Sequence, residues 1–84
     1  MLTFRTDANA TRVLATMSAR VWKQVASNGS MVKSGEDLLV LEAMKMEIAV
    51  KAPGDGPKYS VVAVLKQKGD LVEPGDVLVL LVPS

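Results

Sequence analysis

The sequence predicts an all-β sandwich or barrel, on two observations. Short apolar runs recur at regular spacing, and clusters of glycine, proline and small polar residues separate them. The chain is also internally duplicated, because adding 40 to a position in the first half recovers a matching residue in the second half. The turn glycines Gly29 and Gly35, for example, recur as Gly69 and Gly75. Two copies of one β unit therefore flank a short central segment.

The expected extended segments follow the turn clusters in order. They are residues 12–16, 21–26, 31–32, 38–43, 46–51, 61–65, 71–72 and 77–82. In the second of them, Val21 and Trp22 are both expected to bring large side chains to the core. Residues 1–10 are polar and aperiodic, which indicates a linker or disordered lead-in before a domain at 11–84, with an edge strand at 2–5 as the alternative. The second copy carries about three extra residues, assigned to a surface loop around Pro57-Lys58-Tyr59.

The composition of the stretch from Glu36 to Lys51 favours a helix and so conflicts with the all-β interpretation. It is rich in Leu, Ala, Met, Glu and Lys, which favour helices, and it follows a possible capping sequence at Ser34. The duplicated register decides for strand, because residues 76–81 are Val- and Leu-rich, apolar at consecutive positions and too short for a stable helix. We therefore expect two long antiparallel strands here.

Composition excludes several classes of function. The chain has 84 residues, 49% of them hydrophobic, which suits one small domain with one core. It has no histidine and no cysteine, so it lacks the commonest general base, metal ligand and thiol nucleophile, and we expect no catalytic residue and no metal site. The net charge of +1 is scattered, so neither nucleic acid nor a membrane is an expected partner. Without targeting features, a cytoplasmic location is expected.

The junction of the two central strands is the unusual position. A two-residue hairpin favours positive φ at both residues, hence Asn-Gly or Asp-Gly, yet this chain places Met44-Lys45 there. Two bulky residues in that conformation cost about 1–3 kcal/mol each. Met44 and Met46 either fold back onto the core or are recognised by another protein. Lys45 is either an ordinary solvated turn lysine or the attachment point of a covalent group.

Residues 42–47, Glu42-Ala43-Met44-Lys45-Met46-Glu47, resemble the biotinylation motif of biotin carboxyl carrier domains. The flanking frames Gly29-x-x-Val32-x-x-Gly35-x-x-Leu38 and Gly69-x-x-Val72-x-x-Gly75-x-x-Leu78 resemble the same family, so the similarity covers roughly residues 12–82. It implies a flattened antiparallel β-sandwich, or barrel-sandwich hybrid, of two four-stranded sheets with a pseudo-twofold duplication. Lys45 would lie on the exposed hairpin between the halves.

The resemblance also implies the function. Biotin protein ligase would join biotin to Lys45, biotin carboxylase would carboxylate it, and the domain would carry carboxybiotin to a carboxyltransferase. Met44 and Met46 would serve recognition by the ligase, while Ala43 and Glu42 complete the motif, with Glu42 and Glu47 either steering recognition or solvating the strand ends. The domain resembles a piece of a multifunctional carboxylase, and its residues 21–23 and 46–50 are similar to those of urea carboxylase or urea amidolyase. Acetyl-CoA, propionyl-CoA and pyruvate carboxylase parents remain open.

One departure and two alternatives accompany the resemblance. The family often has a Pro-Met-x-Gly turn where this chain has Thr16-Met17-Ser18-Ala19. Ala19 in place of glycine puts the geometry of that turn in question. A lipoyl carrier is the nearest rival, although its lysine typically follows an acid, as in Asp-Lys-Ala. A non-catalytic β-domain that uses residues 44–46 for protein contact is the other.

Overall fold

The computed structural model describes residues 10–54 and 58–83, and strand is the only regular secondary structure in them. The lead-in expected at residues 1–10 and the edge strand expected at 2–5 fall on residues 1–9, outside the described part. The strands are β1 (Thr11–Leu14), β2 (Ala19–Gln24), β3 (Met31–Lys33), β4 (Asp37–Ala43), β5 (Met46–Lys51), β6 (Lys58–Val64), β7 (Leu71–Val72) and β8 (Val77–Pro83). The all-β prediction is confirmed. The helix alternative for residues 36–51 is excluded, because β4 and β5 occupy that stretch.

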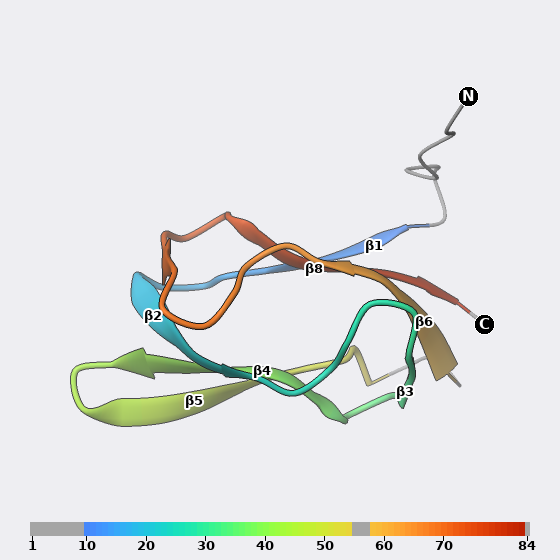
Figure 1. Cartoon of the computed structure of the whole chain (residues 1–84), viewed down its shortest axis with the longest axis horizontal. Helices are drawn as coiled ribbons and strands as arrows, with labels where there is room; N and C mark the ends of the chain where they lie inside the picture. The colour runs from blue at the N-terminus through green and yellow to red at the C-terminus, as the bar shows by residue number, and fades with distance from the viewer. Residues whose placement is uncertain (1–9, 55–57, 84) are drawn as a thin grey trace.

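The strands form two four-stranded antiparallel sheets, in the orders β1-β8-β6-β3 and β5-β4-β2-β7. Figure 1 shows the two layers facing each other, with β1 and β8 above β4 and β5. Neither sheet closes into a barrel, so the fold is a flattened β-sandwich. Each sheet takes strands from both halves of the chain, which ties the halves into one unit.

The internal duplication appears in the hydrogen bonds as well as in the sequence. Replacing β1–β4 by β5–β8, and the reverse, converts one sheet order into the other. The turns repeat this relation: the Gly29 amide donates to the Val61 carbonyl at 2.8 Å, and the Gly69 amide donates to the Val21 carbonyl at 2.9 Å. Each half therefore anchors a turn of the other, and the predicted pseudo-twofold duplication is confirmed.

The core lies between the sheets and is built from equivalent positions of the two halves. Its fully buried members include Leu38 and Leu78, both 0% exposed. The buried core cluster comprises Ala15, Val21, Ala26, Val32, Leu38, Leu39, Leu41, Ala52, Tyr59, Val61, Val72, Leu78, Val79 and Leu81. No charged or polar residue is buried among the described residues. This apolar layer holds the two long central strands in register.

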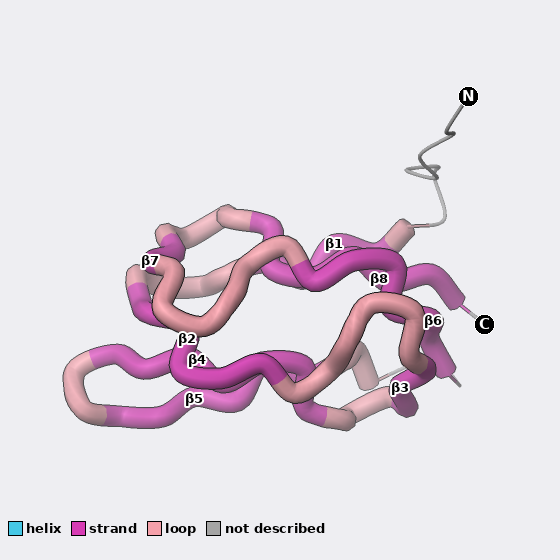
Figure 2. Tube along the Cα trace, viewed as in Figure 1, coloured by secondary structure: helices cyan, strands magenta, loops and turns pink. Residues whose placement is uncertain are grey.

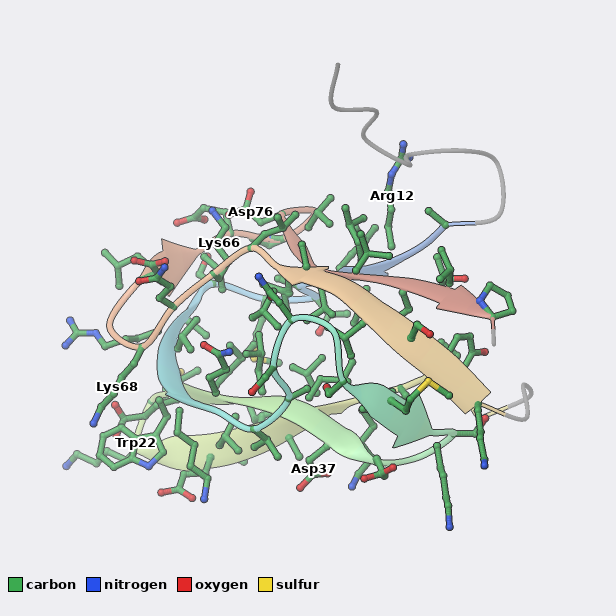
Figure 3. All side chains as sticks on the ribbon, turned by 45° about the vertical axis from the view of Figure 1, so that its right-hand side comes forward. Arg12, Trp22, Asp37, Lys66, Lys68 and Asp76 are labelled. Carbon is green, nitrogen blue, oxygen red and sulfur yellow. The ribbon has the colours of Figure 1, made fainter. Side chains whose placement is uncertain are left out.

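Trp22 corrects one prediction, because it is 43% exposed whereas Val21 is 1% exposed. Val21 pairs with Leu41 and Lys23 pairs with Val40, so Trp22 is the extra residue of a β-bulge. A bulge sets two residues opposite one, which places Trp22 beside Lys23 on the outer face of the sheet. Figure 3 shows the Trp22 side chain at the rim of this sheet rather than between the layers. The expected core role of Trp22 was wrong.

The loop expected at Pro57-Lys58-Tyr59 is a second correction. Lys58 and Tyr59 begin β6, and Tyr59 pairs with Val32 on one side and Pro83 on the other. The Tyr59 side chain is 5% exposed and belongs to the core cluster. Hydrogen bonding on both sides, together with an inward ring, outweighs the turn signals before it. Pro57 lies outside the described residues.

Candidate functional site

The β4–β5 hairpin lies at the end of the sandwich opposite the carboxyl end of β8 (Figure 1). Its last paired residues are Ala43 and Met46, so Met44 and Lys45 alone form the connection. Met44 has φ 51° and Lys45 has φ 69°. Among the described residues, these are the only non-glycine residues with positive φ. The predicted two-residue hairpin with two strained bulky residues is confirmed.

This strain persists because the flanking strands fix the turn. The ladder runs from the Asp37–Lys51 pair to the Ala43–Met46 pair, and β4 carries buried leucines that cannot leave the core. Positive φ at a residue with a Cβ costs about 1–3 kcal/mol. A sequence optimised for stability alone would place Asn-Gly here. Retention of Met44-Lys45 at such a cost indicates that these side chains serve a function.

The side chains at the tip are open to solvent. Met44 is 93% exposed and Met46 is 63% exposed, and Lys45 between them is also exposed. Folding of the two methionines onto the core, one of the two expectations, is therefore excluded. Ala43 and Glu42 are half-buried at the end of β4. The hairpin thus presents an amine between two exposed thioether side chains, which are adaptable contact surface for another protein.

Charged residues form a row across the sheet beside the tip. Glu42 lies directly opposite Glu47 of β5 on one side and opposite Arg20 of β2 on the other. Like charges opposite each other on neighbouring strands are destabilising, by about 0.2–1 kcal/mol. Arg20 was not among the residues singled out from the sequence, because only the strand register places it beside Glu42. At the other end of the hairpin, Lys51 Nζ pairs with Asp37 Oδ1 at 2.6 Å, and the two side chains are 57% and 42% exposed.

A groove lies next to the attachment candidate. It has a volume of about 520 Å³ and runs from the hairpin tip across β2 to β7 and the turn after it. Figure 2 shows β7 and β2 at the same end of the sandwich as the hairpin. The lining residues are Ser18, Ala19, Arg20, Glu42, Met44, Lys45, Leu71, Val72 and Glu73. They come from both halves of the chain, so no single sequence motif could have revealed the groove.

The turn before β2 holds one wall of this groove. Ser18 Oγ donates a hydrogen bond to Glu73 Oε1 at 2.8 Å, which joins the turn to the segment after β7. Ala19 begins β2 and pairs with Val72, and its φ is not positive. Glycine is therefore not required at this position, so the departure Thr16-Met17-Ser18-Ala19 leaves the turn unstrained.

Two other kinds of feature are absent from the part of the chain that the structure describes. Residues 10–54 and 58–83 contain no group of three acidic, histidine or cysteine side chains that could hold a metal ion. Nor does this part of the chain contain a helix long and apolar enough to cross a membrane. What the site does offer is an exposed amine at the tip of the hairpin, which can be acylated.

Comparison with known proteins agrees with this geometry. The biotin/lipoyl family model, described as "Biotin-requiring enzyme", matches residues 11–81. The urea amidolyase of Saccharomyces cerevisiae is 35% identical over 69 residues, which cover 82% of this chain and 4% of that protein. The biotin/lipoyl attachment protein of Bacillus subtilis is 38% identical over 65 residues, covering 77% of this chain and 85% of that protein.

Solved structures include the same fold. The crystal structure of the Kluyveromyces lactis urea carboxylase matches with a TM-score of 0.82 and 30% identity, over 98% of this chain and 7% of that chain. This chain therefore spans only a small part of the two large enzymes and most of the small B. subtilis protein. On the family match and these similarities, the chain belongs to the biotin/lipoyl family of biotin-requiring enzymes.

Proposed function

We propose that this chain is a biotin carboxyl carrier domain and that Lys45 is its attachment residue. The observation that carries the proposal is the tip itself, where an exposed lysine occupies a positive-φ turn that glycine would fill at lower cost. The exposed amine fits covalent attachment as an amide, and no other group is needed to hold the cofactor. Biotin, when bound, supplies a ring nitrogen that can carry a carboxyl group.

The residues of this chain contribute position rather than catalysis. β4 and β5 hold Lys45 at the end of the sandwich, so the attached arm can reach a second protein without unfolding the domain. Met44 and Met46 provide the apolar surface that a biotin protein ligase would contact. Glu42 and Ala43 are the last two residues of β4 and lead the chain into the turn. Tethering then raises the effective concentration of the arm at neighbouring active sites.

The partners of such a domain follow from the proteins that it resembles. Biotin protein ligase is the proposed modifying enzyme, and biotin carboxylase and carboxyltransferase domains are the proposed sites between which the arm moves. The similarity to urea amidolyase and urea carboxylase supports a parent of that class. The domain limits at residues 11–84 and the cytoplasmic location stay predictions.

The test is attachment to the purified chain. Incubation with biotin, ATP and a biotin protein ligase should raise the intact mass by one biotinyl group. Lys45→Arg, which keeps the charge and the turn, should show no gain, whereas Lys51→Arg at the far end of the hairpin should be modified like the wild type. No gain on the wild type, or a gain that survives Lys45→Arg, contradicts the proposal. A gain only with lipoate and a lipoate ligase would assign a lipoyl carrier instead.

A further inference from the structure

The groove beside Lys45 has no role in the carrier function as described above. It is large enough for a small bicyclic ligand, since ligand pockets are typically about 300–1,000 Å³. Lys45 and Met44 form one end of it, and Leu71 and Glu73 form the other. A group attached to Lys45 therefore starts inside the mouth of this groove.

The walls of the groove carry a specific set of polar groups. Arg20 offers guanidinium donors, and Glu42 and Glu73 offer carboxylate acceptors. Within the described residues, Arg20 and Glu42 form no hydrogen bond or ion pair through their side chains, although they lie opposite each other in the sheet. Glu73 uses one carboxylate oxygen to accept from Ser18. The walls of the groove therefore offer a ligand both hydrogen-bond donors and hydrogen-bond acceptors.

A cyclic urea matches this set. Its carbonyl oxygen can accept a hydrogen bond from the Arg20 guanidinium, and its two N–H groups can donate to the carboxylates of Glu42 and Glu73. The apolar side of such a ring system would lie against Leu71, which is 68% exposed, and Met44, which is 93% exposed. Both side chains line the groove and are otherwise open to water.

A biotin arm on Lys45 is long enough to reach the far end of the groove at β7. Neighbouring strands lie about 4.7–4.9 Å apart, so β7 is roughly 10 Å from β4 across β2. A lysine side chain extended by the acyl chain of biotin spans that distance. Because a short tether gives an effective concentration on the order of mM, an intrinsic dissociation constant of about 1 mM is enough to fill the groove half of the time.

We propose that this groove is a resting site for the uncharged cyclic urea ring of biotin on Lys45, bound by Arg20, Glu42 and Glu73. The inference rests on the proposed function. It adds that the domain holds its own ring between visits to its partners. Once Lys45 is acylated its charge is gone, so the charged wall residues are one arginine and two glutamates. A ring that has gained a carboxylate meets net negative charge there and is released, so the groove selects the unloaded ring.

The experiment compares two acylated forms of the intact chain by amide ¹H–¹⁵N correlation spectra. One form carries biotin on Lys45, which intact mass verifies, and the other carries acetyl-lysine at position 45, which has the same loss of charge without the ring. The ring should shift the amides of Arg20 and Val72 in the biotinyl form only. Both amides lie in the groove wall, away from the hairpin tip in sequence.

Charge recognition is tested with matched glutamine variants. Glu73→Gln should at least halve the ring-dependent shift of Val72, because it removes the anion while its amide oxygen can still accept from Ser18. Glu36→Gln, an equal change of charge in a turn outside the groove, keeps an acceptor for the Lys33 amide and should leave the shift unchanged. Spectra in which the biotinyl and acetyl forms agree at Arg20 and Val72 would overturn the inference, as would equal effects of the two variants. Neither result would affect the proposed carrier function, which rests on the mass gain from biotin. Failure to gain that mass would reject the carrier function itself.

Discussion

Replacing Met44-Lys45 by Asn-Gly should make the domain more stable while removing its function. The double variant Met44→Asn with Lys45→Gly keeps the length of the hairpin and supplies the residues that favour positive φ at both positions. In the native chain these positions have φ 51° and 69° with a Cβ on each residue. The turn therefore stores free energy that the substitution releases.

The magnitude follows from two terms. Relief of strain is worth about 1–3 kcal/mol at each residue, and the greater flexibility of glycine in the unfolded chain subtracts about 1 kcal/mol. Lost burial adds little, because Met44 is 93% exposed and contributes almost nothing to the core. The expected gain in the free energy of unfolding is therefore about 1–5 kcal/mol. For a chain of this size, even the lowest of these values raises the Tm by roughly 4–8 °C.

Urea denaturation followed by circular dichroism measures the gain. Lys45→Arg is the matched control, since it keeps a bulky residue at φ 69° and should leave the unfolding midpoint unchanged. An unchanged slope with a higher midpoint identifies a change in stability rather than in compactness. If the Asn-Gly variant is no more stable than the wild type, the argument from backbone strain to function is refuted.

Four further substitutions test the fold around the site, each by the free energy of unfolding. Leu38→Ala and Leu78→Ala, at equivalent positions that are both 0% exposed, should each cost about 2–5 kcal/mol; a much smaller cost at one would show that the halves do not share the core equally. Trp22→Ala should cost only about 1–2 kcal/mol because the side chain is 43% exposed, and a loss of 3–5 kcal/mol would place it in the core after all. Glu47→Lys should stabilise by roughly 0.2–1 kcal/mol, since it turns the like-charge pair with Glu42 into an opposite-charge pair, and a loss would contradict that pairing.

The duplication explains why so much of the fold could be predicted from the sequence. A residue that recurs 40 positions later, such as Leu38 and Leu78, is constrained twice by the same environment, so a helical interpretation of one copy conflicts with the other. The hairpin tip could be predicted for a different reason. A two-residue hairpin turn is known to need positive φ at both residues, and neither Met44 nor Lys45 favours positive φ.

What the sequence could not reveal depends on register and on contacts between the halves. The bulge at Trp22 keeps Lys23 on the same outer face as Trp22, where an alternating pattern would turn Lys23 toward the core, and it is visible only in the pairing with β4. Tyr59 was assigned to a loop because the second half of the chain carries about three extra residues, yet its pairing on both sides places it in a strand. The groove joins Arg20 to Glu73 from separate halves of the chain, a proximity that no local pattern encodes.

Site mapping of the attached group tests the central claim most directly. After ligase treatment of the wild type, proteolysis and tandem mass spectrometry should find the biotinyl group on Lys45 alone, in a peptide that still contains Met44 and Met46. All other lysines, including the exposed Lys51 on the same hairpin, should be unmodified. Biotin on Lys51 or spread over several lysines would contradict the account, because exposure alone would then decide attachment and the strained tip would have no part in it.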